Sequence, residues 1–90
     1  MSLRRYAAKR DSNEREIIDA LVAAGASVQQ LSLKGAPDLL VGFRGETYLM
    51  EVKTAKGKLT PDEQDWLNAW QGQATVVRTI EDAFVVIGAL

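Results

Sequence analysis

Two stretches of the sequence carry apolar residues at helical spacing, and both have clear ends. The first follows possible N-cap residues at positions 11–13 and stops at Gly25. The second starts at the capping pattern Thr60-Pro61-Asp62-Glu63 and stops at Gly72. The pattern therefore predicts helices over residues 11–25 and 60–72. Their apolar stripes are Ile17, Ile18, Leu21, Val22 and Ala24 in the first, and Trp66, Leu67 and Trp70 in the second.

Strand-like patterns fill most of the remaining chain. Residues 26–33 read as a half-polar strand, 38–43 as a strongly apolar strand, and 46–53 as its hairpin partner across an Arg44-Gly45 turn. Residues 74–79 read as a buried strand. Residues 80–87 fit a helix, while the run 84–87 also fits a strand, and we favour a helix. The order αβββαβ, plus this last element, predicts an α/β fold with a mixed sheet flanked by helices.

The length of 90 residues fits one small domain, which we place at residues 11–90 behind a basic N-terminal arm at residues 1–10. No apolar run is long enough for a membrane helix and the N-terminus lacks a secretory pattern, so the expected location is the cytoplasm. The chain has no cysteine and no histidine. Disulfides, thiolate or imidazole zinc sites and histidine bases are thus excluded. Catalysis would rest on carboxylates, lysine, hydroxyls and a hard metal ion.

Three charged residues are predicted to meet at one end of the sheet. Glu51 and Lys53 are two positions apart in a strand, so both side chains point to the same sheet face. Asp38 starts the preceding strand, and pairing through the Arg44-Gly45 turn brings it next to them. Charges that face a helix-covered sheet are costly unless they are paired or functional.

Glu14 interrupts the apolar face of the first predicted helix. On a helical wheel of about 100° per residue it lies with Ile18 and Leu21, whereas Glu16 lies about 200° away, on the solvent side. A break of this kind is typical of a functional site. The alternative is that Glu14 complements the helix dipole from the first turn.

These residues resemble a known family. Pro37-Asp38 stands thirteen positions before Glu51-Val52-Lys53, as in the PD-(D/E)xK nuclease motif, and Glu14 resembles the helix-one glutamate of that superfamily. More narrowly, the segments 35–39, 51–54 and 57–64 are similar to the VRR-NUC domain, which includes stand-alone phage and bacterial nucleases similar to Holliday-junction resolvases. The resemblance covers roughly residues 12–83 and implies a restriction-endonuclease-like fold.

The resemblance implies roles for individual residues. Asp38, Glu51 and the Val52 carbonyl would hold Mg²⁺, for which Mn²⁺ can substitute, because this hard cation takes oxygen ligands. Glu14 would hold a second metal ion or a water on the first. Lys53 would contact the attacking water or the phosphate, with a pKa lowered by burial beside cations. The rival interpretation of Lys53 is a structural salt bridge with Glu51 or Asp38.

Further residues are candidates for catalysis or for DNA binding. Gln64 matches a catalytic glutamine of the family, although simple exposure on the helix flank is also open. Cations positioned for a phosphate backbone form the predicted DNA-binding set. The spacing of Trp66 and Trp70 permits base stacking, but we favour core packing. The DNA-binding set is Arg10, Lys34, Lys56 and Lys58.

The sequence therefore predicts a Mg²⁺-dependent, structure-selective DNA endonuclease of a bacterial or phage-infected cell. Its expected substrate is branched DNA, above all a four-way junction cut by a homodimer, since two symmetric cuts need two sites. One alternative is a nuclease that cuts flaps or single strands together with replication or repair proteins. The other is a non-catalytic DNA-binding module.

Overall fold

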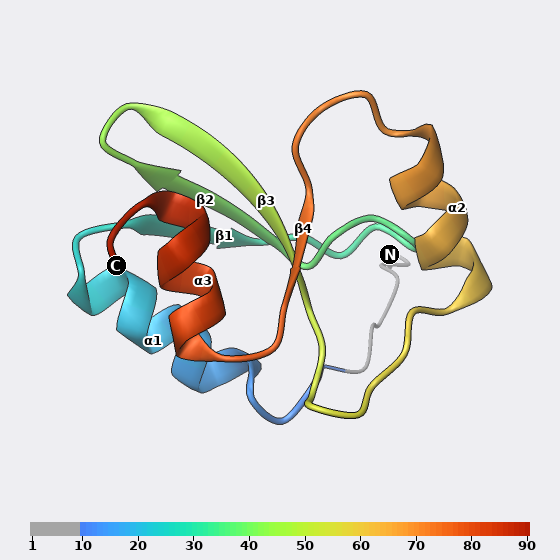
Figure 1. The fold of residues 1–90 in the computed structure, drawn as a ribbon, viewed down its shortest axis with the longest axis horizontal. Helices are drawn as coiled ribbons and strands as arrows, with labels where there is room; N and C mark the ends of the chain where they lie inside the picture. The colour runs from blue at the N-terminus through green and yellow to red at the C-terminus, as the bar shows by residue number, and fades with distance from the viewer. Residues whose placement is uncertain (1–9) are drawn as a thin grey trace, which may run out of the picture.

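A computed structural model of the chain describes residues 10–90, so only Arg10 of the predicted N-terminal arm lies within the described residues. The arrangement of helices and strands follows the predicted order, and the run at the C-terminal end is a helix (Figure 1). No helix in this part of the chain has the length and apolarity needed to cross a membrane. The elements are α1 (Glu14–Ala23), β1 (Ser27–Gln30), β2 (Leu39–Phe43), β3 (Glu46–Val52), α2 (Pro61–Ala69), β4 (Thr75–Val77) and α3 (Ile80–Ile87).

The four strands form one mixed sheet in the order β1-β2-β3-β4. The first two pairings are antiparallel, and β4 joins β3 in parallel after the chain has crossed over through α2. Arg44 and Gly45 both have positive φ, which suits a two-residue hairpin turn whose twist matches the strands. This turn pairs Leu39 with Met50, so Asp38 lies beside Glu51 at the end of the hairpin.

One face of the sheet carries the core. Helices α1 and α3 both lie against this face (Figure 1), and their apolar residues meet those of the strands. Alternation along β3 sends Met50 and Val52 into this core and Glu51 to the opposite face. The fully buried members include Ile17, Leu21, Leu39, Val41, Met50, Val52, Val77 and Ala83.

Helix α2 lies apart from the core, to one side of the sheet (Figure 1). None of its residues is buried, so the prediction that Trp66 and Trp70 pack in the core is wrong. Its start is as predicted: Thr60 and Glu63 form a reciprocal capping box, with Pro61 in the first turn. The apolar stripe of α2 is present as predicted. It does not pack in the core, because α2 lies to one side of the sheet and not across its second face.

The first and fourth strands are shorter than the pattern indicated. Pairing of β1 ends at Gln30, beyond which Leu31 donates one more backbone hydrogen bond to the Asp38 carbonyl at 2.7 Å. The chain then turns through Gly35, whose φ is +82° and whose α-hydrogens face the Asp62 backbone of α2. A side chain there would collide with that helix, so glycine lets the loop pass close to its first turn.

Candidate active site

Asp38 and Glu51 form the centre of the site. Asp38 directly precedes β2 and Glu51 lies in β3, so the hairpin register alone brings them side by side. The backbone N–H of Val52 donates a hydrogen bond to Asp38 Oδ2 at 2.8 Å. Glu51 is only 2% exposed. The two carboxyl groups therefore lie side by side, as the strand pattern predicted, with Glu51 buried and Asp38 partly buried.

Burial makes negative charge costly at this point. It raises the pKa of Asp38, although the Val52 N–H acts in the other direction. For Glu51, burial and then the charges of Asp38 and Glu63 raise the pKa to about 9. At neutral pH the pair therefore retains a proton unless a cation offsets the second charge.

Lys53 lies on the same side of the sheet and is held by two carboxylates. Its ammonium is 2.7 Å from Glu63 Oε1 and 3.6 Å from Glu51 Oε2. Burial alone would lower the pKa of Lys53, but the hydrogen bond and charge of Glu63 and the charge of Glu51 outweigh it, so the pKa is raised. The expectation of a lowered pKa is thus wrong, because the nearest charges are anions. Lys53 is a permanent cation here, and it does make the salt bridge of the rival interpretation.

Glu14 is buried and Glu16 is exposed, as the helical wheel predicted. The Gln30 side chain donates to Glu14 at 2.9 Å, and Arg10 lies 3.3 Å from the same carboxylate. Burial raises the pKa of Glu14 against the opposing effects of Gln30 and Arg10. Arg10 also lies 3.4 Å from Asp38. It thereby links the helix-one glutamate to the strand carboxylates.

Asn13 fixes the start of α1 against the ends of two strands. It is the N-cap residue, yet its side chain makes no cap hydrogen bond. Its amide instead donates to the carbonyls of Lys53 at 3.1 Å and Arg78 at 3.0 Å. These two bonds hold the first turn of the helix beside the site strand, which is how Glu14 comes near Asp38.

Comparison with known proteins supports the fold. One solved structure, described as a VRR-NUC domain, matches with a TM-score of 0.60 and 27% sequence identity, over 84% of this chain and 97% of that one. This match supports the interpretation of the chain as a VRR-NUC domain. No family model and no curated protein matches the sequence.

The donor set of this site suits a small hard cation. Within residues 10–90 no three acidic side chains gather into a metal cage. Two adjacent carboxylates, Asp38 and Glu51, with the neighbouring carbonyl of Val52, nevertheless match the demand of Mg²⁺, which takes one or two carboxylates and keeps several waters. The raised pKa values of Asp38 and Glu51 also favour a cation, because two negative charges at this point would lack sufficient compensation. A divalent cation fits here.

The four predicted DNA-binding cations differ in their exposure and in their partners. Lys56 and Lys58 are exposed in the loop that follows β3. Lys34 is exposed and lies 3.4 Å from Asp62. Arg10, in contrast, is committed to the carboxylates of the site and to the Leu31 carbonyl at 2.9 Å. Three of the four therefore face solvent, and the fourth is part of the site.

Gln64 does not join the other candidates. It is exposed, and its amide donates to Asn68 one turn further along α2 at 3.0 Å. Its neighbour Glu63 reaches the site instead. That carboxylate has a lowered pKa because the hydrogen bonds from Lys53 and Thr60 outweigh the effect of burial. Sequence reasoning missed this role, since the capping box already explained a glutamate at position 63.

Arg78 was also missed. It follows β4, and its guanidinium donates to the carbonyls of Thr54 at 2.6 Å and Gly57 at 2.8 Å. These bonds fix the loop that carries Lys56 and Lys58. A lone arginine after a strand has no periodic signal, so only the tertiary structure reveals this function.

Proposed function

We propose that this VRR-NUC domain is a Mg²⁺-dependent, structure-selective endonuclease that cuts DNA four-way junctions as a homodimer. The observation that carries the proposal is the convergence of Asp38, Glu51 and Lys53 at one end of β2 and β3. Adjacent buried carboxylates repel phosphate, so a domain that only bound DNA would gain nothing from them. Hydrolysis of a phosphodiester bond needs both a cation and a polar group at the reacting atoms.

The carboxylates of Asp38 and Glu51 and the carbonyl of Val52 would hold the Mg²⁺ ion, with Mn²⁺ as a substitute. When bound, the ion neutralises phosphate charge and makes a water molecule more acidic. The Val52 N–H keeps Asp38 oriented through its 2.8 Å hydrogen bond. Glu14, buried beside them, would hold a second ion or orient a water.

Lys53 acts as a charged donor and not as a base, because its carboxylate neighbours keep it protonated. Glu63 holds the ammonium from the side of α2 while Glu51 holds it from the strand. In this position the ammonium can donate to a phosphate oxygen as negative charge develops on it, which is the most effective place for a fixed charge.

The DNA backbone would pass over the loop after β3. Lys56 and Lys58 project from this loop, and Arg78 fixes its carbonyls. The net charge of the whole chain is only −1, so attraction to DNA must come from local cations and not from the overall field. Contacts of this type position the backbone without reading bases, as structure-selective cutting requires.

A substrate panel tests the proposal. A labelled four-way junction, a flap and a single strand are incubated with the full chain in Mg²⁺, in Mn²⁺ and in EDTA, with Asp38→Asn as the inactive control. We expect paired symmetric cuts in the junction that need the metal ion and Asp38. Cleavage of flaps or single strands in preference would replace the junction by the alternative substrate. Binding of DNA without any cleavage would leave a non-catalytic module.

A further inference from the structure

Arg10 lies among the carboxylates of the site although it precedes α1 in the chain. Its guanidinium nitrogen Nη1 is 3.3 Å from Glu14 Oε2 and 3.4 Å from Asp38 Oδ1. One positively charged group thus contacts a carboxylate from the first turn of α1 and a carboxylate that directly precedes β2. Arg10 therefore holds a position between two acids that would otherwise suit a metal ion.

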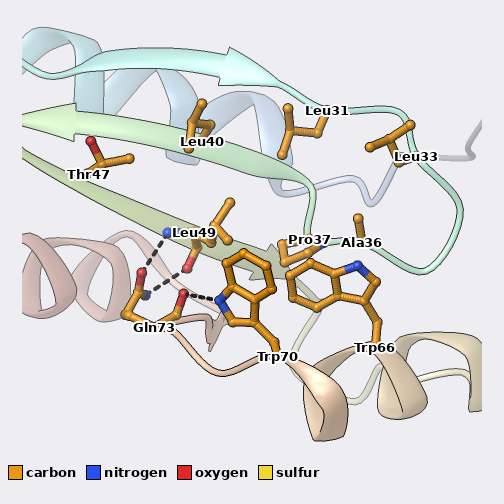
Figure 2. Close-up of a pocket in the computed structure, with 10 residues that line it drawn as sticks. All are labelled: Leu31, Leu33, Ala36, Pro37, Leu40, Thr47, Leu49, Trp66, Trp70 and Gln73. Atoms are coloured by element: carbon orange, nitrogen blue, oxygen red, sulfur yellow. Dashed lines mark hydrogen bonds between the residues drawn. The ribbon is translucent and has the colours of Figure 1, made fainter.

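The fold fixes the guanidinium in this position. Its second terminal nitrogen, Nη2, donates to the Leu31 carbonyl at 2.9 Å and to Ser32 Oγ at 3.1 Å. The Leu31 N–H in turn donates to the Asp38 carbonyl at 2.7 Å. The Leu31 side chain lies on the wall of an apolar groove beside α2 (Figure 2). Leu31 is thereby anchored to the chain next to the site, and its carbonyl anchors Arg10.

These contacts give Arg10 a different role from the loop lysines. Lys56 and Lys58 are exposed, whereas the Arg10 side chain is 28% exposed and both of its terminal nitrogens contact oxygens of this chain. A guanidinium stays charged in proteins and presents its donors in a rigid planar fork. Arg10 is thus a permanent cation with a fixed geometry, as a bound ion would be.

The charge of the contact network in the DNA-free chain matches one divalent ion. Ion pairs include two cations and two pairs of carboxylates, so the fully ionised network has two uncompensated negative charges. Asp11 lies near this network but forms no ion pair within residues 10–90, and a second divalent ion would leave a positive excess even if Asp11 is counted. The cations are Arg10 and Lys53, and the carboxylates are Glu14, Asp38, Glu51 and Glu63.

We infer that Arg10 fills, as a built-in cation, the position between Glu14 and Asp38 that a second metal ion would take, and thereby excludes that ion. The inference rests on the proposed function and narrows it. With one ion at Asp38 and Glu51, the site holds a single divalent cation, and Glu14 keeps only the role of orienting a water. Arg10 is then a positioning residue that holds two carboxylates in place.

A count of bound Mn²⁺ ions tests the inference without DNA and without cleavage. Free Mn²⁺ gives a paramagnetic resonance signal that is lost on binding, so a titration yields the number of ions per chain. We expect one ion per wild-type chain and two in Arg10→Met, which removes the charge and keeps a long side chain. Two ions per wild-type chain, or no additional ion in folded Arg10→Met, would overturn the inference.

Arg15→Met is the matched control, because it removes the same charge outside the site. The Arg15 side chain is 66% exposed, and its guanidinium lies 3.4 Å from Asp19 on the same helix. This variant should still bind one ion. An additional ion in Arg15→Met, equal to that in Arg10→Met, would show that overall charge limits binding and not the position of Arg10.

Variants of Glu14 locate the additional ion. Glu14→Gln combined with Arg10→Met should return the count from two ions to one, because it removes the carboxylate that the loss of Arg10 sets free. Glu14→Gln alone should keep the wild-type count, as should Glu16→Gln on the exposed face of α1. Loss of an ion in Glu14→Gln alone would show that Glu14 is a metal ligand. That result would overturn the inference whether or not Arg10→Met folds.

The same titration separates this inference from the proposed function. Asp38→Asn should abolish binding of the wild-type ion if the proposed function is right. A wild-type chain that binds no ion would reject the metal-dependent nuclease, yet an ion gained in Arg10→Met would still support exclusion by Arg10. A wild-type chain that binds two ions, one lost in Asp38→Asn and one in Glu14→Gln, would retain the nuclease and reject the inference.

Discussion

The buried carboxylates predict an unusual dependence of stability on pH in metal-free buffer. The pKa of Glu51 is 4.5 in a model peptide and about 9 in the folded chain. Between these values the unfolded chain loses the proton and the folded chain keeps it. The contribution of Glu51 to stability is therefore complete below about pH 4.5 and is lost as the pH rises towards 9.

The magnitude follows from the linkage between proton binding and folding. One proton retained only in the folded state lowers the unfolding free energy by about 1.4 kcal/mol per pH unit, hence by about 4 kcal/mol from pH 5 to pH 8. The pKa of Asp38 is also raised, so the decrease of unfolding free energy with rising pH is steeper at the acidic end of this range. The raised pKa of Lys53 changes the stability only above this pH range, and the lowered pKa of Glu63 changes it only below this range. The total unfolding free energy of a small domain is only about 5–15 kcal/mol, so a loss of this size is easy to measure.

Denaturant unfolding in EDTA at five pH values from 5 to 9 measures this slope. The substitution Glu51→Gln should flatten most of it, since the amide cannot titrate, and it should make the protein more stable than wild type at pH 8. Glu16→Gln, on the exposed face of the same domain, should leave the slope unchanged. Stability that is constant or rises from pH 5 to pH 8, or an unaltered slope in Glu51→Gln, would show that Glu51 does not retain its proton in the folded chain.

Three further predictions concern single side chains. Glu14→Gln should slow cleavage by orders of magnitude, whereas Glu16→Gln should change the rate hardly at all and the stability by less than about 0.5 kcal/mol; single-turnover rates and melts check both. Glu63→Gln should slow cleavage more than Gln64→Ala, because Glu63 contacts Lys53 and Gln64 contacts Asn68. Equal cleavage rates in the two variants would show that Glu63 has no role in positioning Lys53. Asn13→Ala should cost about 1–3 kcal/mol in denaturant unfolding, since two strand-end carbonyls lose their donor.

Much of the fold follows from local patterns. Capping residues, glycine stops and alternating apolar positions predicted every helix and strand in the right order, because each of these signals acts over a few residues. The ends of β1 and β4 were less well predicted, since pairing with a neighbour, and not the pattern, decides where a strand stops. The apolar stripe of α2 shows a similar limit: Trp66 and Trp70 mark a face that needs cover, but not what covers it.

The site divides in the same way. Strand alternation and one tight turn were enough to bring Asp38, Glu51 and Lys53 together, and the helical wheel was enough to bury Glu14. Contacts made by long side chains across the fold were not predictable. Arg10 reaches the site carboxylates from 28 positions before Asp38, and Arg78 reaches the loop of Thr54 from 24 positions after it, with no periodic signal in either case.

In the proposed nuclease, Asp38 and Glu51 hold the Mg²⁺ ion that cleavage of DNA requires. The most direct measurement is the single-turnover cleavage rate of a four-way junction as a function of Mg²⁺ concentration. We predict no cleavage in EDTA, saturation with Mg²⁺, loss of the rate in Glu51→Gln and an unchanged rate in Glu16→Gln. Cleavage that persists in EDTA, or full Mg²⁺-dependent activity in Glu51→Gln, would show that these carboxylates do not hold a metal ion needed for cleavage.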